Sequence, residues 1–235
     1  MKRSLKILAG AALALAGVAA PASTPRNWDD LAGATADGMP VLGNQAAPVR
    51  LIEFISYTCP HCATYATESD QPLSTGLVRQ GQVAVEMRPY FRNGIDVVAT
   101  LLALCGPDEK FFANHQAILS AQESWLRAPL NPNAQQRWAN PVFGERLKAV
   151  AEDLGLYRIM LNRGYTPVEL DQCLADETLA KSHEVATQYA YEKLGVQGTP
   201  SFMINGQLQT VHSWPELEQA LNAAVAARKT PVEKR

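Results

Sequence analysis

The chain has 235 residues, a length that suits one domain with a sizeable core or a small fold carrying an insertion. Its formal net charge is -2, and this slightly acidic balance argues against a nucleic acid or an anionic membrane as a partner. Four cysteines are too few for a disulfide-dense scaffold, so each of them needs its own explanation.

The first 22 residues have the pattern of an export signal. The apolar stretch 7–20 is preceded by three basic residues, Lys2, Arg3 and Lys6. The small residues up to Ala22 fit a signal-peptidase site. We therefore expect cleavage near Ala22 and a mature protein in the periplasm, where disulfides persist. An uncleaved anchor is the alternative, although the stretch is shorter than the roughly 20 apolar residues of a spanning helix. Cleavage would leave 18 basic and 23 acidic residues, a net charge of -5.

A strand, a helix and a second strand are expected next. Residues 49–56 are almost continuously apolar, which predicts a short strand buried on both faces. The cysteine motif TCPHC begins at Thr58, and the stretch 61–81 is expected to be helical, with a kink at Pro72. Residues 82–87 alternate between apolar and polar, so a second strand closes this unit.

A helical block is expected over about 94–194. Its first helix is apolar around most of its circumference and ends at Gly106-Pro107. The Pro- and Asn-rich stretch 127–141 is predicted to be a loop. Farther on, residues 166–169 read TPVE, a capping box with proline in the first helical position.

The chain closes with a hairpin and a helix. Strands at 201–204 and 207–211 flank Asn205-Gly206, a strong hairpin signal, and a helix follows the capping box at Ser213. This order predicts an α/β fold with a helical insertion.

The expected domain covers residues 48–226. Before it lies an Ala-, Gly- and Pro-rich lead-in, 23–47, whose island at 39–43 could add an edge strand, and after it a loose tail, 227–235.

The motif Cys59-Pro60-His61-Cys62 admits several kinds of site. A zinc ribbon needs a second close pair of cysteines, and attachment of c-type haem needs a histidine directly after the second cysteine, where this chain has Ala63. Two other functions of the motif remain as alternatives. One is a soft-metal site that includes His61, and the other is an inert structural disulfide. The third possible function is thiol–disulfide exchange, and each residue of the motif has a physical property that favours it.

Cys59 should be the reactive thiol because it lies where a strand ends and a helix begins. Pro60 is tolerated in the first turn, and the free backbone N–H groups there favour a thiolate. His61 can add a hydrogen bond or a positive charge. Cys62, one turn deeper, should be buried and keep a higher pKa. Each unit by which the thiolate pKa falls below ambient pH stabilises the reduced form by about 1.4 kcal/mol, or roughly 30 mV.

Two segments resemble the DsbA-like thiol-disulfide oxidoreductases. LIEFISYTCPHC is similar to their active-site region, and GVQGTPSFMINGQ is similar to their loop ending in a cis-proline. The resemblance runs from about Gly43 to Val225 and implies a thioredoxin fold in which Cys59 exchanges and Cys62 resolves the mixed disulfide. It also implies that Pro200 is the cis-proline. No cofactor is needed, and reoxidation would come from a DsbB-like membrane quinone reductase.

Glu53 and Thr199 are further candidate site residues. Glu53 shares a face with apolar neighbours in the predicted strand, so burial should raise its pKa. Its position matches the acidic residue that this family keeps beneath the active site, where it can exchange a proton with Cys62; the alternative is a strand-end glutamate that reaches solvent. Thr199 stands where the archetypal DsbA has an aliphatic residue, which resembles the isomerase-like branches. The alternative there is a threonine merely suited to a strand edge.

Cys105 and Cys173 each lie on the apolar face of a predicted helix. In an oxidising compartment a structural disulfide is expected, with reduced core thiols as the alternative. His115 falls among apolar residues and is interpreted as a core histidine.

These observations predict an exported, DsbA-like enzyme that donates the Cys59–Cys62 disulfide to newly exported proteins. The nearest alternative is a disulfide isomerase or reductase, favoured by Thr199. A periplasmic metal carrier using Cys59, His61 and Cys62 is the alternative from another class. Residues 23–47 hold no convincing heptads, so a monomer is expected.

Overall fold

The computed structural model describes residues 31–229, so the expected export signal and its cleavage near Ala22 lie outside the described part of the chain. Within that part, the strands form a six-stranded sheet in the order β1-β2-β4-β3-β5-β6. The strands are β1 (Ala32–Ala34), β2 (Pro40–Leu42), β3 (Val49–Ile55), β4 (Val83–Pro89), β5 (Ser201–Ile204) and β6 (Gln207–Leu208).

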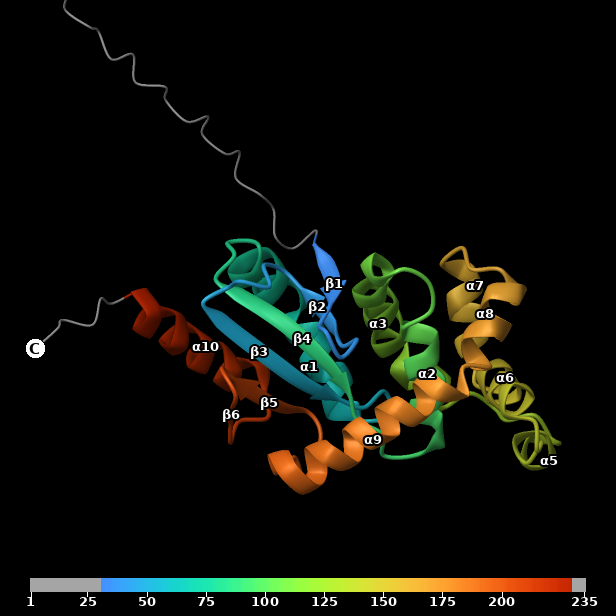
Figure 1. Ribbon diagram of the computed structural model, residues 1–235. Helices are drawn as coiled ribbons and strands as arrows, with labels where there is room; N and C mark the ends of the chain where they lie inside the picture. The colour runs from blue at the N-terminus through green and yellow to red at the C-terminus, as the bar shows by residue number, and fades with distance from the viewer. Residues whose placement is uncertain (1–30, 230–235) are drawn as a thin grey trace, which may run out of the picture.

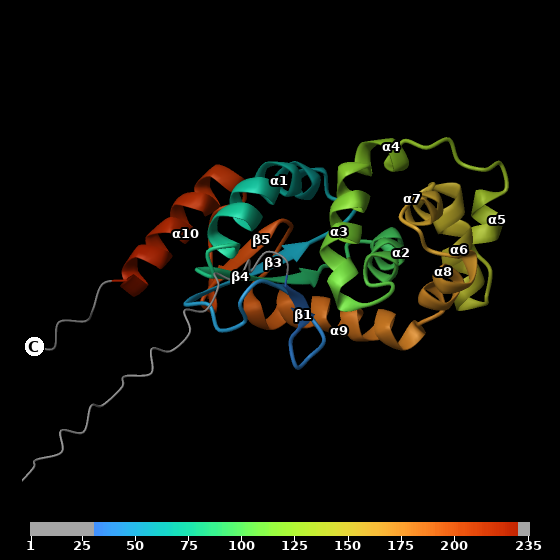
Figure 2. The ribbon, with the colours of Figure 1, turned by 90° about the horizontal axis from the view of Figure 1, so that it is seen from above.

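Helices cover both faces of this sheet and extend beyond it (Figures 1 and 2). They are α1 (Pro60–Gln71), α2 (Gly94–Ala103), α3 (Phe111–Ser120), α4 (Gln122–Leu126), α5 (Ala134–Trp138), α6 (Phe143–Asp153), α7 (Leu156–Asn162), α8 (Pro167–Leu174), α9 (Glu177–Leu194) and α10 (Trp214–Lys229). A π-helical segment, η2 (Pro72–Val78), continues α1 past the expected kink, and a 3-10 turn, η3 (Asp108–Lys110), precedes α3. Helices α1 and α10 lie on one face, and the end of α9 lies on the other.

Strand β3 is central because it pairs with β4 in parallel and with β5 antiparallel. Its side chains alternate between the two faces, as the pleat of a strand requires. Leu51 and Ile55 join the main core with α1 and α10, whereas Phe54 packs with Ala190 and Val196 at the end of α9. Both faces are therefore buried, and the predicted α/β fold with a helical insertion, a thioredoxin fold, is confirmed.

The helical block follows β4 and returns to the sheet through α9. Helices α2 to α8 stand beside the sheet rather than on it, and the long helix α9 runs from this block back beneath the strands (Figure 2). A disulfide joins Cys105, just after α2, to Cys173 in α8, with the Cα atoms 5.5 Å apart. The second cysteine pair thus joins the segment just after α2 to α8, in line with the expected structural disulfide, although Cys105 lies past the end of α2 and not within a helix as expected.

The N-terminal segment contributes more strand than expected. The island at 39–43 forms β2, but it lies inside the sheet, between β4 and the edge strand β1. Strand β1 reads Ala-Gly-Ala, which has no apolar alternation for a sequence pattern to detect. Backbone pairing with β2, not side-chain burial, accounts for its place.

Three local predictions need correction. The stretch predicted as a loop, 127–141, contains the five-residue helix α5, whose Arg137 and Trp138 both bond to Asp153. The last hairpin strand, β6, ends at Leu208 instead of 211, and the chain then turns to bring His212 to the carbonyl oxygen of Pro200. Helix α10 continues to Lys229, past the expected start of the tail.

Between residues 31 and 229, no helix is both long and apolar enough to cross a membrane.

Candidate active site

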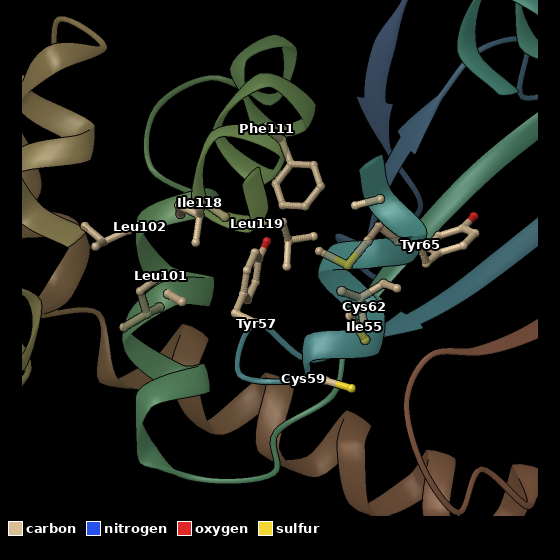
Figure 3. Close-up of a cluster of buried hydrophobic side chains, with 14 of the residues drawn as sticks. Ile55, Tyr57, Cys59, Cys62, Tyr65, Leu101, Leu102, Phe111, Ile118 and Leu119 are labelled. Atoms are coloured by element: carbon tan, nitrogen blue, oxygen red, sulfur yellow. The ribbon is translucent and has the colours of Figure 1, made fainter. Parts of the chain in front are cut away.

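Cys59 is the residue immediately before helix α1. Strand β3 ends at Ile55, and residues 56–59 form a turn that leads into the helix. The backbone of Cys59 is extended, with φ -90° and ψ 117°, and Pro60 occupies the first helical position, where its missing N–H has no partner to lose. Figure 3 shows the Cys59 sulfur at this end of the helix and Cys62 farther along it, inside the protein.

The environment of Cys59 favours its ionised form. The thiol of Cys62 hydrogen-bonds to the Cys59 sulfur and is the largest cause that lowers the pKa of Cys59, from 9.0 to about 4. The Thr199 side chain and the backbone N–H groups of Cys62 and His61 lower it further, and they outweigh the opposing effect of burial. Cys59 and Cys62 are not bonded to each other in this structure, and the Cys59 sulfur lies 3.2 Å from the Thr199 carbonyl oxygen, to which it donates a hydrogen bond when it is protonated.

Cys62 differs from Cys59 in its surroundings although both belong to the same motif. It is completely buried, and burial raises the pKa of its thiol well above 9.0, with the neighbouring Cys59 sulfur adding to the effect. One thiol of the pair is therefore held as an anion and the other is held protonated. This separation suits a nucleophile and a resolving thiol.

His61 acts through its main chain instead of its ring. The sequence suggested that the imidazole would place a hydrogen bond or a positive charge beside the Cys59 sulfur. The part of His61 that contributes to the low Cys59 pKa is its backbone N–H, after the larger effects of Cys62 and Thr199, while the exposed side chain lines a groove next to the Thr199–Pro200 bond.

Glu53 lies on the central strand β3 and is 5% exposed. Burial raises the pKa of its carboxyl from 4.5 to about 7, and the hydroxyl of Tyr65, which donates a hydrogen bond to Oε1, partly offsets that rise. The alternative that Glu53 reaches solvent at the end of the strand is wrong, because Phe54 and Ile55 continue the buried strand past it.

Tyr65 is a site residue that the sequence patterns did not identify. It lies one turn after Cys62 in α1, and the negative charges of Glu53 and Cys62 both raise the pKa of its phenol, after burial itself. Its ring packs against Phe202, with the centroids 4.7 Å apart. The i, i+3 spacing from Cys62 was the available signal, because residues so spaced share one helix face.

A small pocket opens beside Glu53. Its volume is about 80 Å³, and polar side chains including Ser69, Asp70 and His115 line it together with Glu53 and Tyr65. A buried carboxyl next to such a pocket has a route by which water and protons can reach it. His115 is buried as expected, and burial lowers its pKa to about 4.

The loop before β5 forms the other wall of the site. The peptide bond between Thr199 and Pro200 is cis, as the family resemblance implied. A groove of about 560 Å³ runs beside this bond, and its lining includes His61, His212 and Glu216. The ring Nδ1 of His212 lies 2.9 Å from the carbonyl oxygen of Pro200 and helps to hold the loop. Among residues 31–229, no three His, Cys, Asp or Glu side chains are grouped so that they could hold a metal ion.

The sequence matches one family model, described as thioredoxin, over residues 35–223. Among solved structures, a protein-disulfide isomerase from Novosphingobium aromaticivorans is 40% identical, with a TM-score of 0.75. The match covers 81% of this chain and 99% of that one. The alpha-DsbA1 of Wolbachia pipientis is 18% identical with a TM-score of 0.67, covering 83% of this chain and 94% of that one, which shows a shared fold.

Curated relatives are more distant in sequence. A putative protein-disulfide oxidoreductase of Rickettsia bellii is 25% identical over 194 residues, which are 82% of this chain and 67% of the relative. Disulfide bond formation protein D of Bacillus subtilis is 23% identical over 178 residues, covering 73% of this chain and 69% of that protein. The chain spans a smaller share, 61%, of the related putative oxidoreductase of Rickettsia felis.

Proposed function

Since the chain belongs to the thioredoxin family, we propose that it is a DsbA-like thiol-disulfide oxidoreductase whose exchanging pair is Cys59 and Cys62. The observation that carries the proposal is the contrast between the two sulfurs: the pKa of Cys59 is lowered to about 4, and that of buried Cys62 is raised. The 40% identical solved structure, named as a protein-disulfide isomerase, supports the same chemistry.

In the oxidised enzyme, a substrate thiolate attacks the Cys59 sulfur of the Cys59–Cys62 disulfide. A bond forms between the substrate and Cys59, and Cys62 leaves as a thiolate that must take up a proton. A second substrate thiolate then attacks the substrate sulfur of this mixed disulfide, and Cys59 leaves. The substrate loses two electrons and gains a disulfide, and the enzyme pair gains the two electrons. This exchange needs no cofactor.

The two steps make different demands on the site. Cys59 is the leaving group of the second step, and a low pKa makes a thiolate leave faster. Cys62 is the leaving group of the first step, and burial makes its thiolate costly until it is protonated. We assign that proton to Glu53, whose carboxyl has a pKa of about 7 and so holds a proton in a large fraction of molecules near neutral pH.

The cis peptide bond at Pro200 and the groove beside it provide the place for the substrate chain. Thr199 presents its backbone oxygen to the Cys59 sulfur, and the groove at His61 and His212 is wide enough for side chains that flank a substrate cysteine. We infer that the substrates are unfolded or newly exported proteins with free thiols, in the periplasm. A DsbB-like membrane quinone reductase would reoxidise the pair, and the enzyme would act as a monomer.

The low Cys59 pKa favours the oxidase role over the reductase role. Each unit by which the thiolate pKa lies below ambient pH makes the disulfide more oxidising by roughly 30 mV. The decisive experiment is equilibration of the purified protein with glutathione mixtures, together with the rate of disulfide formation in a reduced, unfolded protein. A potential near or above that of glutathione and a rate abolished by Cys59→Ala support the proposal. A potential as reducing as that of thioredoxin, or a rate that survives this substitution, contradicts it.

Disulfide isomerisation is the second candidate, because the 40% identical structure carries that name and because Thr199 precedes the cis-proline. An isomerase acts in the reduced state, in which Cys59 attacks a wrong disulfide of the substrate. Recovery of active enzyme from a scrambled, fully oxidised protein distinguishes the two roles. An isomerase speeds this recovery when it is supplied reduced, whereas an oxidase speeds only the oxidation of free thiols.

A further inference from the structure

The turn that carries Cys59 is held from outside by a glutamine of the helical block. Gln122, at the start of α4, is 4% exposed. Its Nε2 atom donates hydrogen bonds to the main-chain oxygens of Tyr57, at 2.7 Å, and of Cys59, at 2.9 Å. One side-chain amide thus holds two peptide groups of the four-residue turn 56–59.

Two more residues of the block hold the same turn. Asp96 in α2 is fully buried; its Oδ1 accepts from the Ser56 hydroxyl and from the Thr58 N–H, both at 2.9 Å. His115 in α3 places Nδ1 2.9 Å from the Tyr57 hydroxyl. Figure 3 shows Tyr57 reaching from the turn toward this block, next to Ile118 and Leu119. Helices α2, α3 and α4 therefore contact every residue of the turn up to Cys59.

The contact with Cys59 determines the direction of a peptide group at the start of α1. The Cys59 oxygen also accepts from the N–H of Cys62, at 3.1 Å, and of Ala63, at 3.3 Å, which are the first bonds of the helix. With the oxygen held on the Gln122 side, the Cys59 sulfur stays near the N–H groups of His61 and Cys62 that favour its charge. If the turn loosens, the sulfur moves away from those dipoles and their benefit falls steeply.

We propose that Gln122 is a positioning residue for thiol–disulfide exchange, which keeps the Cys59 sulfur at the start of α1 by holding the main-chain oxygens of Tyr57 and Cys59. The inference rests on the proposed function of Cys59. It gives the helical block a role in reactivity, because the block supplies the group that holds the catalytic turn in place. A purely structural role of Gln122 would affect only folding stability. The test must therefore measure the pKa of the Cys59 thiol and the redox constant of the Cys59–Cys62 pair.

The test compares Gln122→Met with Gln135→Met in the full exported chain. Methionine keeps the length of glutamine but has no N–H donor, and Gln135 is an exposed residue of α5 remote from the cysteines. Ultraviolet absorbance of the thiolate gives the Cys59 pKa, and glutathione equilibria give the redox constant. In Gln122→Met we expect the pKa to rise by about one unit and the disulfide to become about tenfold, or roughly 30 mV, less oxidising. Gln135→Met should match the unsubstituted protein in both.

A Gln122→Met variant that folds and keeps both values within error of the unsubstituted protein would overturn the proposal. If that variant does not fold, Gln122→Leu serves in its place, since it removes the amide donors without adding a charge or an O–H group, and unchanged values there overturn the proposal equally. Failure of the proposed function looks different. In that case the unsubstituted protein catalyses no exchange, while the absorbance titration still shows whether Gln122 influences the sulfur.

Discussion

The hydroxyl of Tyr65, in α1, donates a hydrogen bond to Oε1 of Glu53, in β3. Both side chains are buried, and Tyr65 lies within the electrostatic range of Cys62 as well. A carboxyl, a phenol and a thiol, each with a pKa raised by burial, therefore occupy one small region between β3 and α1. Clustering of perturbed groups is typical of functional sites.

Replacing Glu53 by glutamine should stabilise the protein at alkaline pH. Burial raises the pKa of Glu53 from 4.5 to about 7, so its contribution to stability is fully present below about pH 4.5 and is lost as the pH rises through 7. Glutamine does not titrate and can still accept from Tyr65. Urea unfolding at pH 8 should show Glu53→Gln to be more stable by roughly 3 kcal/mol, with little difference at pH 4.

The matched control is Glu184→Gln, on the exposed surface of α9, which should unfold like the unsubstituted protein at both pH values. A Glu53→Gln variant with the same pH profile as the unsubstituted protein would show that the carboxyl is not held in a desolvated state.

Tyr65→Phe should raise the Glu53 pKa above 7, because the hydroxyl is the group that lowers it against burial. Loss of a hydrogen bond to a buried polar group costs about 1–3 kcal/mol, and the cost should be larger at pH 8, where the carboxylate is charged. Nuclear magnetic resonance of the carboxyl carbon of Glu53 measures the pKa directly. The control is Tyr189→Phe on exposed α9, and a Glu53 pKa equal in both variants would contradict the role given to Tyr65.

Cys62→Ala should raise the pKa of Cys59. The Cys62 thiol is the largest cause of the low value, while the N–H groups of His61 and residue 62 remain after the substitution. The thiolate absorbance of the variant should therefore titrate above pH 4 but still below the value of 9.0 for a free thiol. If the Cys59 pKa of the variant equals that of the unsubstituted protein, the Cys62 thiol does not lower it, and the N–H groups at the start of α1 account for the whole decrease. The same variant should trap mixed disulfides with substrate, because it has no resolving thiol.

The reduced and oxidised forms should differ in how their stability depends on pH. The Cys59 pKa is lowered from 9.0 in a free thiol to about 4, so the stabilisation of the reduced form is fully present above pH 9 and is lost as the pH falls toward 4. The disulfide does not titrate. Urea unfolding of both forms between pH 4 and pH 8 should show that the free energy of unfolding of the reduced form increases, relative to that of the oxidised form, as the pH rises. A constant difference would contradict the low pKa.

The disulfide between Cys105 and Cys173 should contribute stability but no reactivity. It closes a loop of 68 residues, for which the chain-entropy model gives about 4 kcal/mol. Calorimetry of the double variant Cys105→Ala, Cys173→Ala should show a lower melting temperature, while its glutathione equilibrium stays unchanged. A changed redox constant in this variant would contradict this prediction. It would mean that loss of the Cys105–Cys173 disulfide alters the turn 56–59 through α2.

Much of the sheet and several helix starts could be predicted, because their signals are local. The apolar run of β3, the proline after Cys59 and the Asn205-Gly206 turn, whose residues both have positive φ, each act within a few residues. The strand β1 and the helix α5 were missed because their stability comes from partners distant in the chain, a neighbouring strand and Asp153. Local patterns carry no information about such partners.

The sequence by itself determined the chemistry proposed for the site: two cysteines with two residues between them, at a helix start, after a strand that holds a glutamate. Only the tertiary structure decided which groups control those sulfurs. Gln122 lies 63 residues from Cys59 in the chain, and no sequence pattern joins the two, whereas Thr199, 140 residues away, could be named only through the family resemblance. The physical reason is that pKa values and turn geometry depend on burial and on hydrogen bonds across a few ångströms, and folding alone brings those distant residues together.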